Sequence, residues 1–362
     1  MRRILARVTV GATAWLLCAA TVWAQQPPAE RAGPLPEPAA AKAFISSVTT
    51  RNWTTPKTPW GDPDLQGVFT SKDEANTPFQ RPDQWTGRRI DDISPAELAG
   101  AVTKRQAEAI ERAPFAGGGE SQSGIAIAVP IHWFDNLASR NSRPWFLIEP
   151  ADGKIPPRTA DAQARSVAVR PPNGDYPNSY LDRDVADRCI VFSTGGVWQL
   201  PIIYGNSYQI LQTPDHVVMR YEMVHEARII PLDGRPQVSS RVRGYVGDSR
   251  GHWDGNTLVV VTTNFNENLE YRDFPIFNEG LTAAGGPARN LRMIERFTRI
   301  APNKVEWTTT IDDPTEWTRP WTYSYPLTQD STQPIFEYAC HEGNYGMANI
   351  LSSGRAAERK GR

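Results

Sequence analysis

The 362-residue sequence is poor in cysteine, nearly neutral in charge, and contains one apolar run of notable length. It has three cysteines, and no two of them form a CxxC pair, which argues against a cysteine-based metal or redox motif. The formal net charge of −1 argues against nucleic acid as a partner. Outside residues 8–22, no stretch approaches the roughly 18 apolar residues that a membrane-spanning helix needs, so no membrane span is expected.

The N-terminus has the features of a secretory signal peptide. Arg2, Arg3 and Arg7 precede the apolar run, and residues 22–24 provide a signal-peptidase site, with cleavage expected after Ala24. Removing residues 1–24 takes away three arginines and no acid, so the formal charge changes from −1 to −4. We therefore expect a periplasmic or secreted protein.

Two cysteines remain after this cleavage, Cys189 and Cys340. In an oxidising compartment, a single pair most simply forms one disulfide, which would close a loop of about 150 residues. The alternative is two buried free thiols.

The rest of the chain divides into two parts. Residues 25–57 are rich in proline and alanine without a sustained apolar period, which predicts a tether that lies over the surface or stays mobile. Residues 58–362 are expected to form one β-rich domain with an N-terminal helical layer. Its clear helix is predicted to begin after Ser94, which forms a capping box with Glu97, and to end near residue 112. A short helix is expected after Tyr345.

Strand signals dominate from residue 189 onward, at intervals of about 8–12 residues. The expected strands are 145–148, 189–193, 207–213, 217–224, 226–231, 239–246, 257–265, 292–300, 304–311, 320–327 and 335–340. Two Asp-Gly pairs, Asp233-Gly234 and Asp254-Gly255, lie between β-branched and aromatic runs, which predicts a hairpin at each pair. We therefore predict a mainly β fold, either a lipocalin-like antiparallel barrel or a sandwich.

Four stretches resemble a large family of secreted, mostly uncharacterised bacterial β-rich proteins. They read GDSRGHWDGNTLVVVTTNF, EARIIPLDGRP, DDPTEWTRPWT and FEYACHEGNYGMANIL. The resemblance covers roughly residues 58–358 and implies one continuous β-rich domain, but it implies no particular reaction. Members of this family more often read W-E-G-D-T-L-V-V-D-T, where this chain has Asp254, Asn256 and Val261. If the two acids missing here share a catalytic role in the family, this chain lacks it.

Alternation along residues 217–230 predicts two faces of different character. The odd positions are apolar except for His225, and an imidazole on an apolar face is a setting that perturbs a pKa. His225 is thus either an acid/base residue or a core histidine bonded to a backbone carbonyl. The even positions form either a solvated ladder of charges or the lining of a polar cavity. They include Arg220, Glu222, Glu226 and Arg228.

Polar residues also follow the second cysteine at an expected strand end. His341 and Glu342 come directly after Cys340 and before the C-terminal helix. Because scaffolds place catalytic groups at strand ends and loops, this pair is a second acid/base candidate. The alternative is that these residues cap the helix.

The sequence Gly-Asp-Ser-Arg-Gly-His-Trp, residues 247–253, is dense in functional groups. Asp248 is a candidate to orient an imidazole, and Ser249 is a candidate nucleophile with His252 as its base. A nucleophile elbow requires a strand-to-helix turn, whereas a hairpin is expected here. A turn held by Asp and Ser hydrogen bonds is therefore the simpler interpretation.

Metal ligation is not indicated by residue spacing. The chain has five histidines, and neither His-Glu pair continues into His-Glu-x-x-His. We expect no metal and no cofactor, and a zinc site assembled from distant strands is the remaining alternative.

Aromatic residues alternate along two expected strands. The odd positions of 317–325 are largely aromatic, and Trp307 lies on the corresponding face of 305–311. Such a stripe forms either the core or the wall of a pocket for a flat apolar ligand or a sugar. The expected substrate-binding residues are Trp253, Trp307, Trp321, Tyr323 and Tyr221.

These patterns favour an exported enzyme that uses acid/base chemistry on a small apolar, aromatic or glycosidic molecule, as a lyase, isomerase or hydrolase. Its expected catalytic residues are His225, His341, Glu342 and Asp248. Two alternatives belong to other classes, namely a non-catalytic periplasmic binding barrel for an apolar or sugar ligand and an envelope interaction protein.

Overall fold

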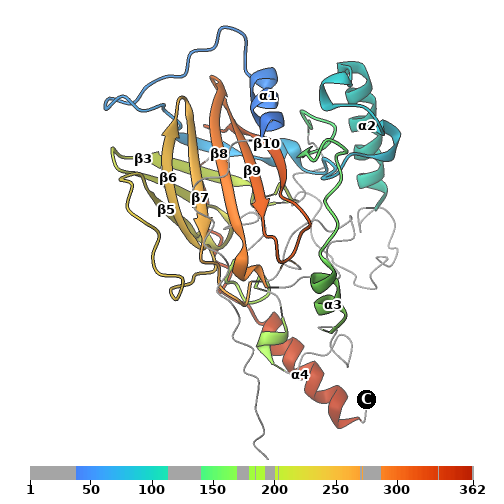
Figure 1. Ribbon diagram of the computed structural model, residues 1–362. Coiled ribbons are helices and arrows are strands. Elements are labelled where there is room, and N and C mark those ends of the chain that lie inside the picture. The colour runs from blue at the N-terminus through green and yellow to red at the C-terminus, as the bar shows by residue number, and fades with distance from the viewer. Residues whose placement is uncertain are drawn as a thin grey trace, which may run out of the picture. The chain divides into compact units, whose positions relative to one another are not determined.

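Within the described residues, ten β-strands form one antiparallel sheet, and nine of them curl into a nearly closed barrel, which confirms the predicted mainly β fold (Figure 1). The computed structural model describes residues 38–112, 140–168, 179–183, 185–191, 200–202, 204–269, 271, 287–332 and 334–360. All of them belong to one compact unit, Leu35–Arg362. The expected signal peptide, residues 1–24, lies outside the described residues.

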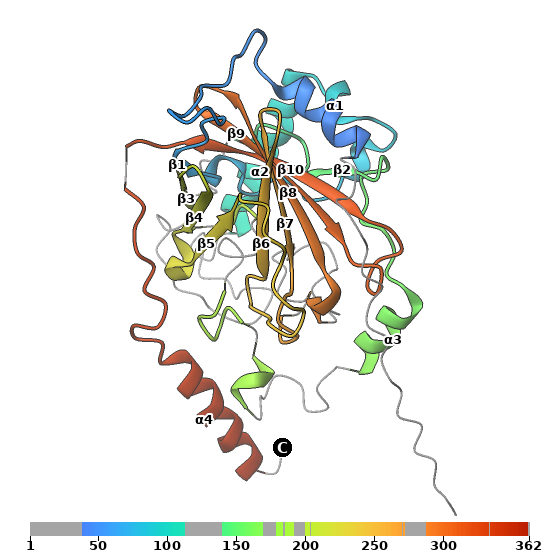
Figure 2. The same ribbon diagram turned by 60° about the vertical axis from the view of Figure 1, so that its left-hand side comes forward.

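Ten strands are present in the described sheet. They are β1 (Gly67–Thr70), β2 (Leu147–Glu149), β3 (Ser207–Gln212), β4 (His216–Tyr221), β5 (Ala227–Pro231), β6 (Asp248–Asp254), β7 (Thr257–Thr263), β8 (Arg292–Ala301), β9 (Lys304–Asp312) and β10 (Trp321–Gln329). The order around the barrel is β5-β4-β3-β1-β10-β9-β8-β7-β6, and β2 pairs with β10 beside this path. Figure 2 shows the barrel turned so that β5 and β6 come forward.

Four α-helices and several short 3-10 turns accompany the strands in the described part of the chain. The helices are α1 (Ala39–Val48), α2 (Pro95–Arg112), α3 (Ala160–Ala168) and α4 (Gly346–Arg359). The 3-10 turns are Lys72–Glu74, Asp83–Trp85, Ile90–Asp92, Tyr180–Asp182, Met223–His225 and Ala288–Asn290. The helices predicted after Ser94 and Tyr345 are thus confirmed as α2 and α4.

The start of α2 has the predicted capping box. The backbone N–H of Ser94 donates to Glu97 Oε2 at 2.9 Å, and the N–H of Glu97 donates to Ser94 Oγ at 3.3 Å. A hydrogen bond from Arg88, together with those from Ser94, lowers the pKa of Glu97 to about 2. The carboxylate is therefore charged at neutral pH and satisfies backbone donors of the first helical turn.

The barrel interior is filled by aromatic rings from adjacent strands. Residues directly opposite in an antiparallel ladder share a face, and Tyr325 lies opposite Trp307, which lies opposite Phe297. The ring of Trp307 lies 4.8 Å from that of Phe297 and 5.6 Å from that of Tyr325, between centroids. All three side chains are at most 1% exposed. The predicted alternation is therefore confirmed for residues 305–311 and 321–325, whereas Trp317, which was predicted to continue the same face, precedes β10.

The two end strands of the sheet, β5 and β6, lie side by side without belonging to one ladder. Close approach is possible because β6 has a glycine at its centre. A Cβ added at Gly251 would lie 2.8 Å from Leu232 Cδ2 and 2.9 Å from Ile230 Cγ2. Side chains of β5 and of the residue that follows it therefore pack directly on the backbone of β6, and this line of contact is called the seam below.

The outer face of β8–β10 is covered by N-terminal segments and is also buried. Arg143 reaches this face and pairs with Glu306, with Nη1 2.7 Å from Oε1. Its guanidinium lies 5.0 Å from the ring centroid of Phe44 in α1. The structure thus differs from the predicted tether at residues 39–48, which form a helix because Ala41 and Phe44 bury an apolar face there.

Several strand predictions were wrong. Asp233-Gly234 does not close a hairpin, since β5 and β6 are the two ends of the sheet. Residues 239–246 and 335–340 form turns and irregular structure, as do the described residues of 189–193. Asp254-Gly255 does connect a hairpin, in which Asp254 lies opposite Thr257.

Gly247, at the entry to β6, is required by both conformation and space. Its φ is +70°, and an added Cβ would lie 2.6 Å from the backbone O of Thr263. The left-handed conformation alone costs a non-glycine residue about 1–2 kcal/mol. We expect Gly247→Ala to lower the free energy of unfolding by more than this amount, measured by urea denaturation.

Gly234 provides the matched control for that prediction. Its φ is +74°, but an added Cβ would meet no atom within 4 Å. Gly234→Ala should therefore show the conformational cost without the clash. Equal losses in the two variants would contradict the steric part of the argument.

Candidate functional site at the disulfide end of the barrel

One end of the barrel is tied by the disulfide between Cys189 and Cys340, which confirms the predicted pairing. At this end β3, β6 and β10 begin and β4 ends. The side-chain amide of Asn344 donates to the backbone O of Asp187 at 3.2 Å. Two segments of the chain that are 151 residues apart are thus held together beside the strand ends, and this region is called the disulfide end below.

His225 lies in a turn at the disulfide end. The predicted apolar face was wrong here, because β4 ends at Tyr221 and the chain reverses before β5. The side chain of His225 is exposed, and its Nδ1 lies 3.3 Å from the backbone O of Tyr338. Both Val224 and His225 have positive φ, 58° and 43°. A β-branched residue rarely adopts this conformation, so the turn is strained.

His341 and Glu342 are close in sequence to this contact. Both side chains are exposed, and Cys340 directly precedes them. His225 reaches Tyr338, two residues before the disulfide. Two segments that are far apart in the sequence are therefore in contact. One contains His225, and the other contains His341 and Glu342.

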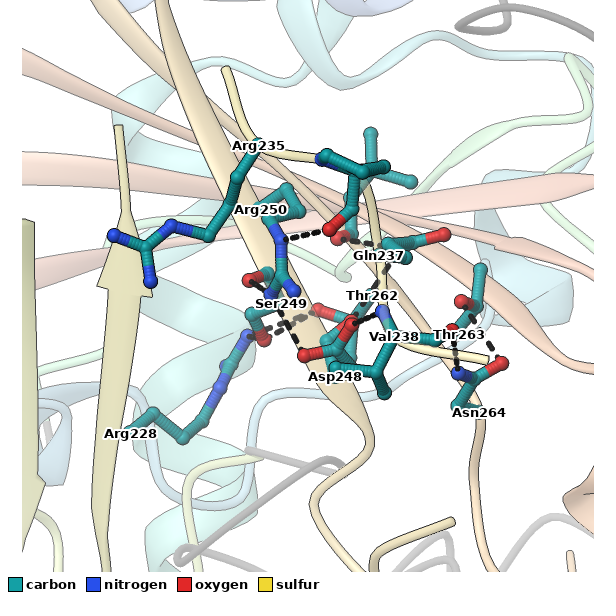
Figure 3. Close-up of polar contacts among 12 residues, drawn as sticks. Arg228, Arg235, Gln237, Val238, Asp248, Ser249, Arg250, Thr262, Thr263 and Asn264 are labelled. Atoms are coloured by element: carbon teal, nitrogen blue, oxygen red, sulfur yellow. Dashed lines mark hydrogen bonds and ion pairs between the residues drawn. The ribbon is translucent and has the colours of Figure 1, made fainter. Parts of the chain in front are cut away.

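Asp248 lies on the outer face of β6, where its carboxylate is already engaged (Figure 3). It pairs with Arg250, at 2.6 Å from Nη1, and accepts the backbone N–H of Val238 at 2.9 Å. Gln237 adds longer side-chain hydrogen bonds to the backbone O atoms of Asp248 and Val261. These contacts fasten the loop between β5 and β6 onto the barrel, and they indicate an anchoring function for Asp248.

Ser249 and His252 lie on opposite faces of β6, because they are an odd number of residues apart in one strand. Ser249 is buried, and its Oγ lies 2.9 Å from Thr262 Oγ1, whereas His252 is exposed. This arrangement does not provide the serine–histidine pair considered for a nucleophile. The strand continues into a hairpin, as expected.

The inner face of β6 belongs to a buried polar cluster centred on Arg228 of β5 (Figure 3). The Arg228 Nη2 atom donates to Ser249 Oγ and Thr262 Oγ1, both at 3.1 Å. Two hydrogen bonds at 3.0 and 2.5 Å join its guanidinium to Glu295 of β8. Burial lowers the pKa of Arg228, but Glu295 and Tyr221 outweigh it, so the net shift is upward.

This cluster corrects the prediction that Arg228 shares a face with Arg220, Glu222 and Glu226. The reversal between β4 and β5 changes the register, so Arg228 points inward and Ile229 is 64% exposed. The alternation of residues along the sequence did not predict the buried position of Glu295, because β8 is buried on both faces. The cluster joins β5 to β6, β7 and β8 across the seam by side chains.

Four of the five expected substrate-binding residues are packed in the core. Tyr221, Trp307, Trp321 and Tyr323 are at most 1% exposed and contact other aromatic rings. Burial raises the pKa of Tyr323. Trp253 is half-buried on β6, one pair of residues before the hairpin turn at the opposite end of the barrel.

A tyrosine pair completes the disulfide end. The rings of Tyr204 and Tyr338 are stacked, with centroids 6.3 Å apart. Burial raises the pKa of Tyr204 to about 12, and the neighbouring Tyr338 adds to that shift. Tyr204 is therefore a neutral hydrogen-bonding group at physiological pH.

Among the described residues, no three His, Cys, Asp or Glu side chains are arranged to hold a metal ion. None of the described helices is both long and apolar enough to cross a membrane.

Comparisons with known proteins add little. No family model matches the chain, and no curated protein matches it. One solved structure that matches is a secretary abundant heat soluble protein from Ramazzottius varieornatus. It is 10% identical, with a TM-score of 0.21, over 34% of this chain and 70% of that chain. A likeness at this level carries no argument about this protein.

Proposed function

We propose that this protein is an exported enzyme that performs proton-transfer chemistry on a small molecule at the disulfide end of the barrel. His225 and His341 serve as its acid and base, and Glu342 orients one of the two imidazoles. The reaction belongs to the lyase, isomerase or hydrolase class, in which a base removes a proton from the substrate or from water and an acid donates one to the leaving group or to another position of the substrate.

The observation that carries the proposal is the strained turn at Val224-His225, which is docked on the Tyr338 carbonyl. A non-glycine residue with positive φ costs on the order of 1–3 kcal/mol, and such strain clusters at active sites. Here the strain orients a solvent-accessible imidazole beside the segment that carries a second imidazole and a carboxylate. Histidine changes its charge near neutral pH, which suits it to act as acid or base.

Exposed apolar side chains flank the same segment and favour an apolar or aromatic substrate. Phe336 is 56% exposed, five residues before His341, and Tyr345 is 76% exposed, four residues after it. An exposed apolar surface of this kind is a common mark of a binding site. In this proposal these rings contact the substrate, while the buried aromatic residues support the barrel.

Export is supported by the disulfide. Structural disulfides persist in oxidising compartments and are rare where cytosolic reductants act. Together with the N-terminal sequence, this chemistry favours a periplasmic or secreted protein.

The test uses conservative replacements of both imidazoles. His225→Asn keeps a residue that tolerates positive φ and bonds to a carbonyl, but it does not titrate near neutral pH. Turnover of a small-molecule library by the wild-type protein, followed by mass spectrometry, identifies a substrate. We then expect His225→Asn and His341→Gln each to lower kcat about 10²–10⁴-fold with little change in ligand affinity.

His252→Gln is the matched control, since His252 is exposed on β6 away from the disulfide contacts. It should keep full turnover. If no library member is turned over by the wild-type protein, or if both imidazole variants keep full activity, the enzyme proposal fails.

The hydrogen bond from His225 to a carbonyl favours one second candidate, a non-catalytic binding barrel. An imidazole held in this way has an ordinary structural function. Saturable binding of apolar or sugar ligands without any chemical change of the ligand would support this candidate over the enzyme.

A further inference from the structure

An arginine that the proposed function does not use, Arg188, also lies at the disulfide end of the barrel. It directly precedes Cys189, while His341 directly follows Cys340. The Cα atoms of the two cysteines are 5.6 Å apart. Since consecutive Cα atoms are about 3.8 Å apart, the Cα atoms of Arg188 and His341 are separated by at most about 13 Å. The two residues are therefore close enough for both side chains to reach one small molecule.

Asn344 fixes the turn that begins with His341 against the backbone on both sides of Arg188. Its side-chain amide donates to the backbone O of Asp187 and to Sγ of Cys189, both at 3.2 Å. Its backbone N–H donates to the backbone O of His341 at 3.4 Å. The position of Arg188 relative to the His341 turn is thus set by the disulfide and by these hydrogen bonds.

The guanidinium of Arg188 contacts two aromatic residues. Its Cζ lies 5.5 Å from the ring centroid of Tyr180, which is a cation–π contact. Its Nη2 donates a long hydrogen bond of 3.5 Å to the hydroxyl of Tyr245, in the loop before β6. A capped turn positions Tyr180, because Ser179 Oγ accepts the backbone N–H of Leu181. The guanidinium is therefore oriented by protein contacts before any ligand binds.

Arg188 has no anionic partner among the described residues. Its contacts there are the two tyrosines, and its side chain is partly exposed. The neighbouring Arg183, by contrast, is paired with Asp187, with Nε 2.7 Å from Oδ2. An aromatic ring and one hydroxyl do not neutralise a guanidinium, and its planar donor groups match a carboxylate. The positive charge of Arg188 is therefore available to a ligand.

We propose that Arg188 binds the carboxylate of the substrate, so that the substrate is a small aromatic monocarboxylate. This substrate class rests on the proposed function at the disulfide end. The carboxylate accepts hydrogen bonds from the guanidinium, and the aromatic body contacts the ring of Tyr345, which is 76% exposed and directly follows Asn344. Glu342, on the same turn as His341, disfavours a second negative charge on the substrate.

The test is titration of the disulfide-bonded protein with phenylacetate and with phenylacetamide, its neutral counterpart of the same shape, followed by NMR of the histidine rings. We expect saturable binding of phenylacetate, at least about tenfold tighter than that of the amide, because only the acid accepts charged hydrogen bonds. The ring signals of His341 should shift on binding, whereas those of His252 on β6 should not. Arg188→Met should weaken phenylacetate binding about 10- to 100-fold and leave that of the amide unchanged.

Two further variants separate binding from folding. Arg188→Lys keeps the charge but loses the planar donor groups, so it should weaken phenylacetate binding less than Arg188→Met does. Arg235→Met is the matched control, since it removes an arginine that is paired with Asp233 beyond the other end of β5, and it should leave both affinities unchanged. The Tm of each variant, compared with that of the wild type, shows whether the fold is retained.

Three results would overturn the assignment of Arg188. They are equal binding of acid and amide, an Arg188→Met variant with unchanged affinity for phenylacetate, and no binding of phenylacetate in the millimolar range. Tighter binding of phenyl phosphate than of phenylacetate would overturn the choice of a carboxylate.

Failure of the carboxylate site and failure of the proposed enzyme give different results. Turnover that depends on His225 and His341, but is equal for acids and their amides, would support the enzyme and refute the carboxylate site. Binding of phenylacetate that depends on Arg188, without turnover of any library member, would support the carboxylate site and refute the enzyme.

Discussion

Arg228→Met is expected to lower the free energy of unfolding by about 3–5 kcal/mol, because it leaves the buried carboxylate of Glu295 without its partner. Glu295 is 0% exposed, and Arg228 is 3% exposed. The change also removes the donor shared by Ser249 and Thr262 across the seam. Urea denaturation at neutral pH, followed by tryptophan fluorescence, measures the loss.

A double variant distinguishes the cost of an unpaired charge from the value of the pair. Arg228→Met combined with Glu295→Met should recover much of the lost stability, since apolar replacement of a buried ion pair is often close to neutral. The surface pair of Arg235 and Asp233 is the matched control, and Arg235→Met should leave the free energy of unfolding nearly unchanged. If Arg228→Met lowers the free energy of unfolding no more than Arg235→Met does, the Arg228 cluster does not stabilise the seam.

We also expect the barrel of the Arg228→Met variant to unfold locally at the seam first. Without Arg228, β5 has lost its side-chain hydrogen bonds to β6, β7 and β8, and no backbone ladder joins β5 to β6. Hydrogen exchange of β4 and β5 should therefore accelerate more than that of β8 and β9, which pair on both sides. Uniform acceleration across the barrel would indicate global destabilisation alone.

Replacing both Cys189 and Cys340 with serine is expected to lower the free energy of unfolding by roughly 5 kcal/mol in the chain-entropy model. The disulfide closes a loop with a sequence separation of 151, and a longer loop loses more conformational freedom in the unfolded chain. Measured losses for native disulfides lie at about 2–5 kcal/mol. Urea denaturation of the oxidised wild-type protein and of the double variant provides the comparison.

Reduction of the wild-type protein is the control for that experiment. It should reproduce the stability of the double variant, because both remove the same cross-link. The contact between His225 and Tyr338 should loosen in both cases, so proton exchange of the His225 ring, followed by NMR, should change as well. A loss below about 1 kcal/mol would mean that the 151-residue connection contributes little to restricting the unfolded chain.

The core of the barrel was the part that sequence pattern predicted best. Alternation in β9 and β10 correctly placed Trp307, Trp321 and Tyr323 on one face, since side chains of a strand point alternately to its two sides. The α2 capping box was equally visible, because Ser94 and Glu97 interact across three residues. Such features depend on local geometry, and local geometry is encoded in adjacent residues.

The alternation of apolar and polar residues gave wrong strand faces where a strand ended without a clear turn signal in the sequence. Residues 217–230 looked like two aligned strands, but the reversal at Met223–His225 shifted the register and turned Arg228 inward. The opposite error occurred at Asp233-Gly234, where good hairpin chemistry lies between strands that do not pair. Turn residues define a bend in the chain, whereas strand pairing depends on the closure of the whole sheet.

The candidate sites also combine features that adjacent residues predict with features that depend on the whole fold. The sequence alone determined the cysteine pair as a potential cross-link, the β-rich character of the chain, and the residue types available for acid/base chemistry. Tertiary structure alone decided that Asp248 is bound to Arg250, that Glu295 meets Arg228, and that His225 reaches Tyr338. These contacts join residues from different strands and loops, and their formation depends on the curvature of the barrel, which no local pattern of residues records.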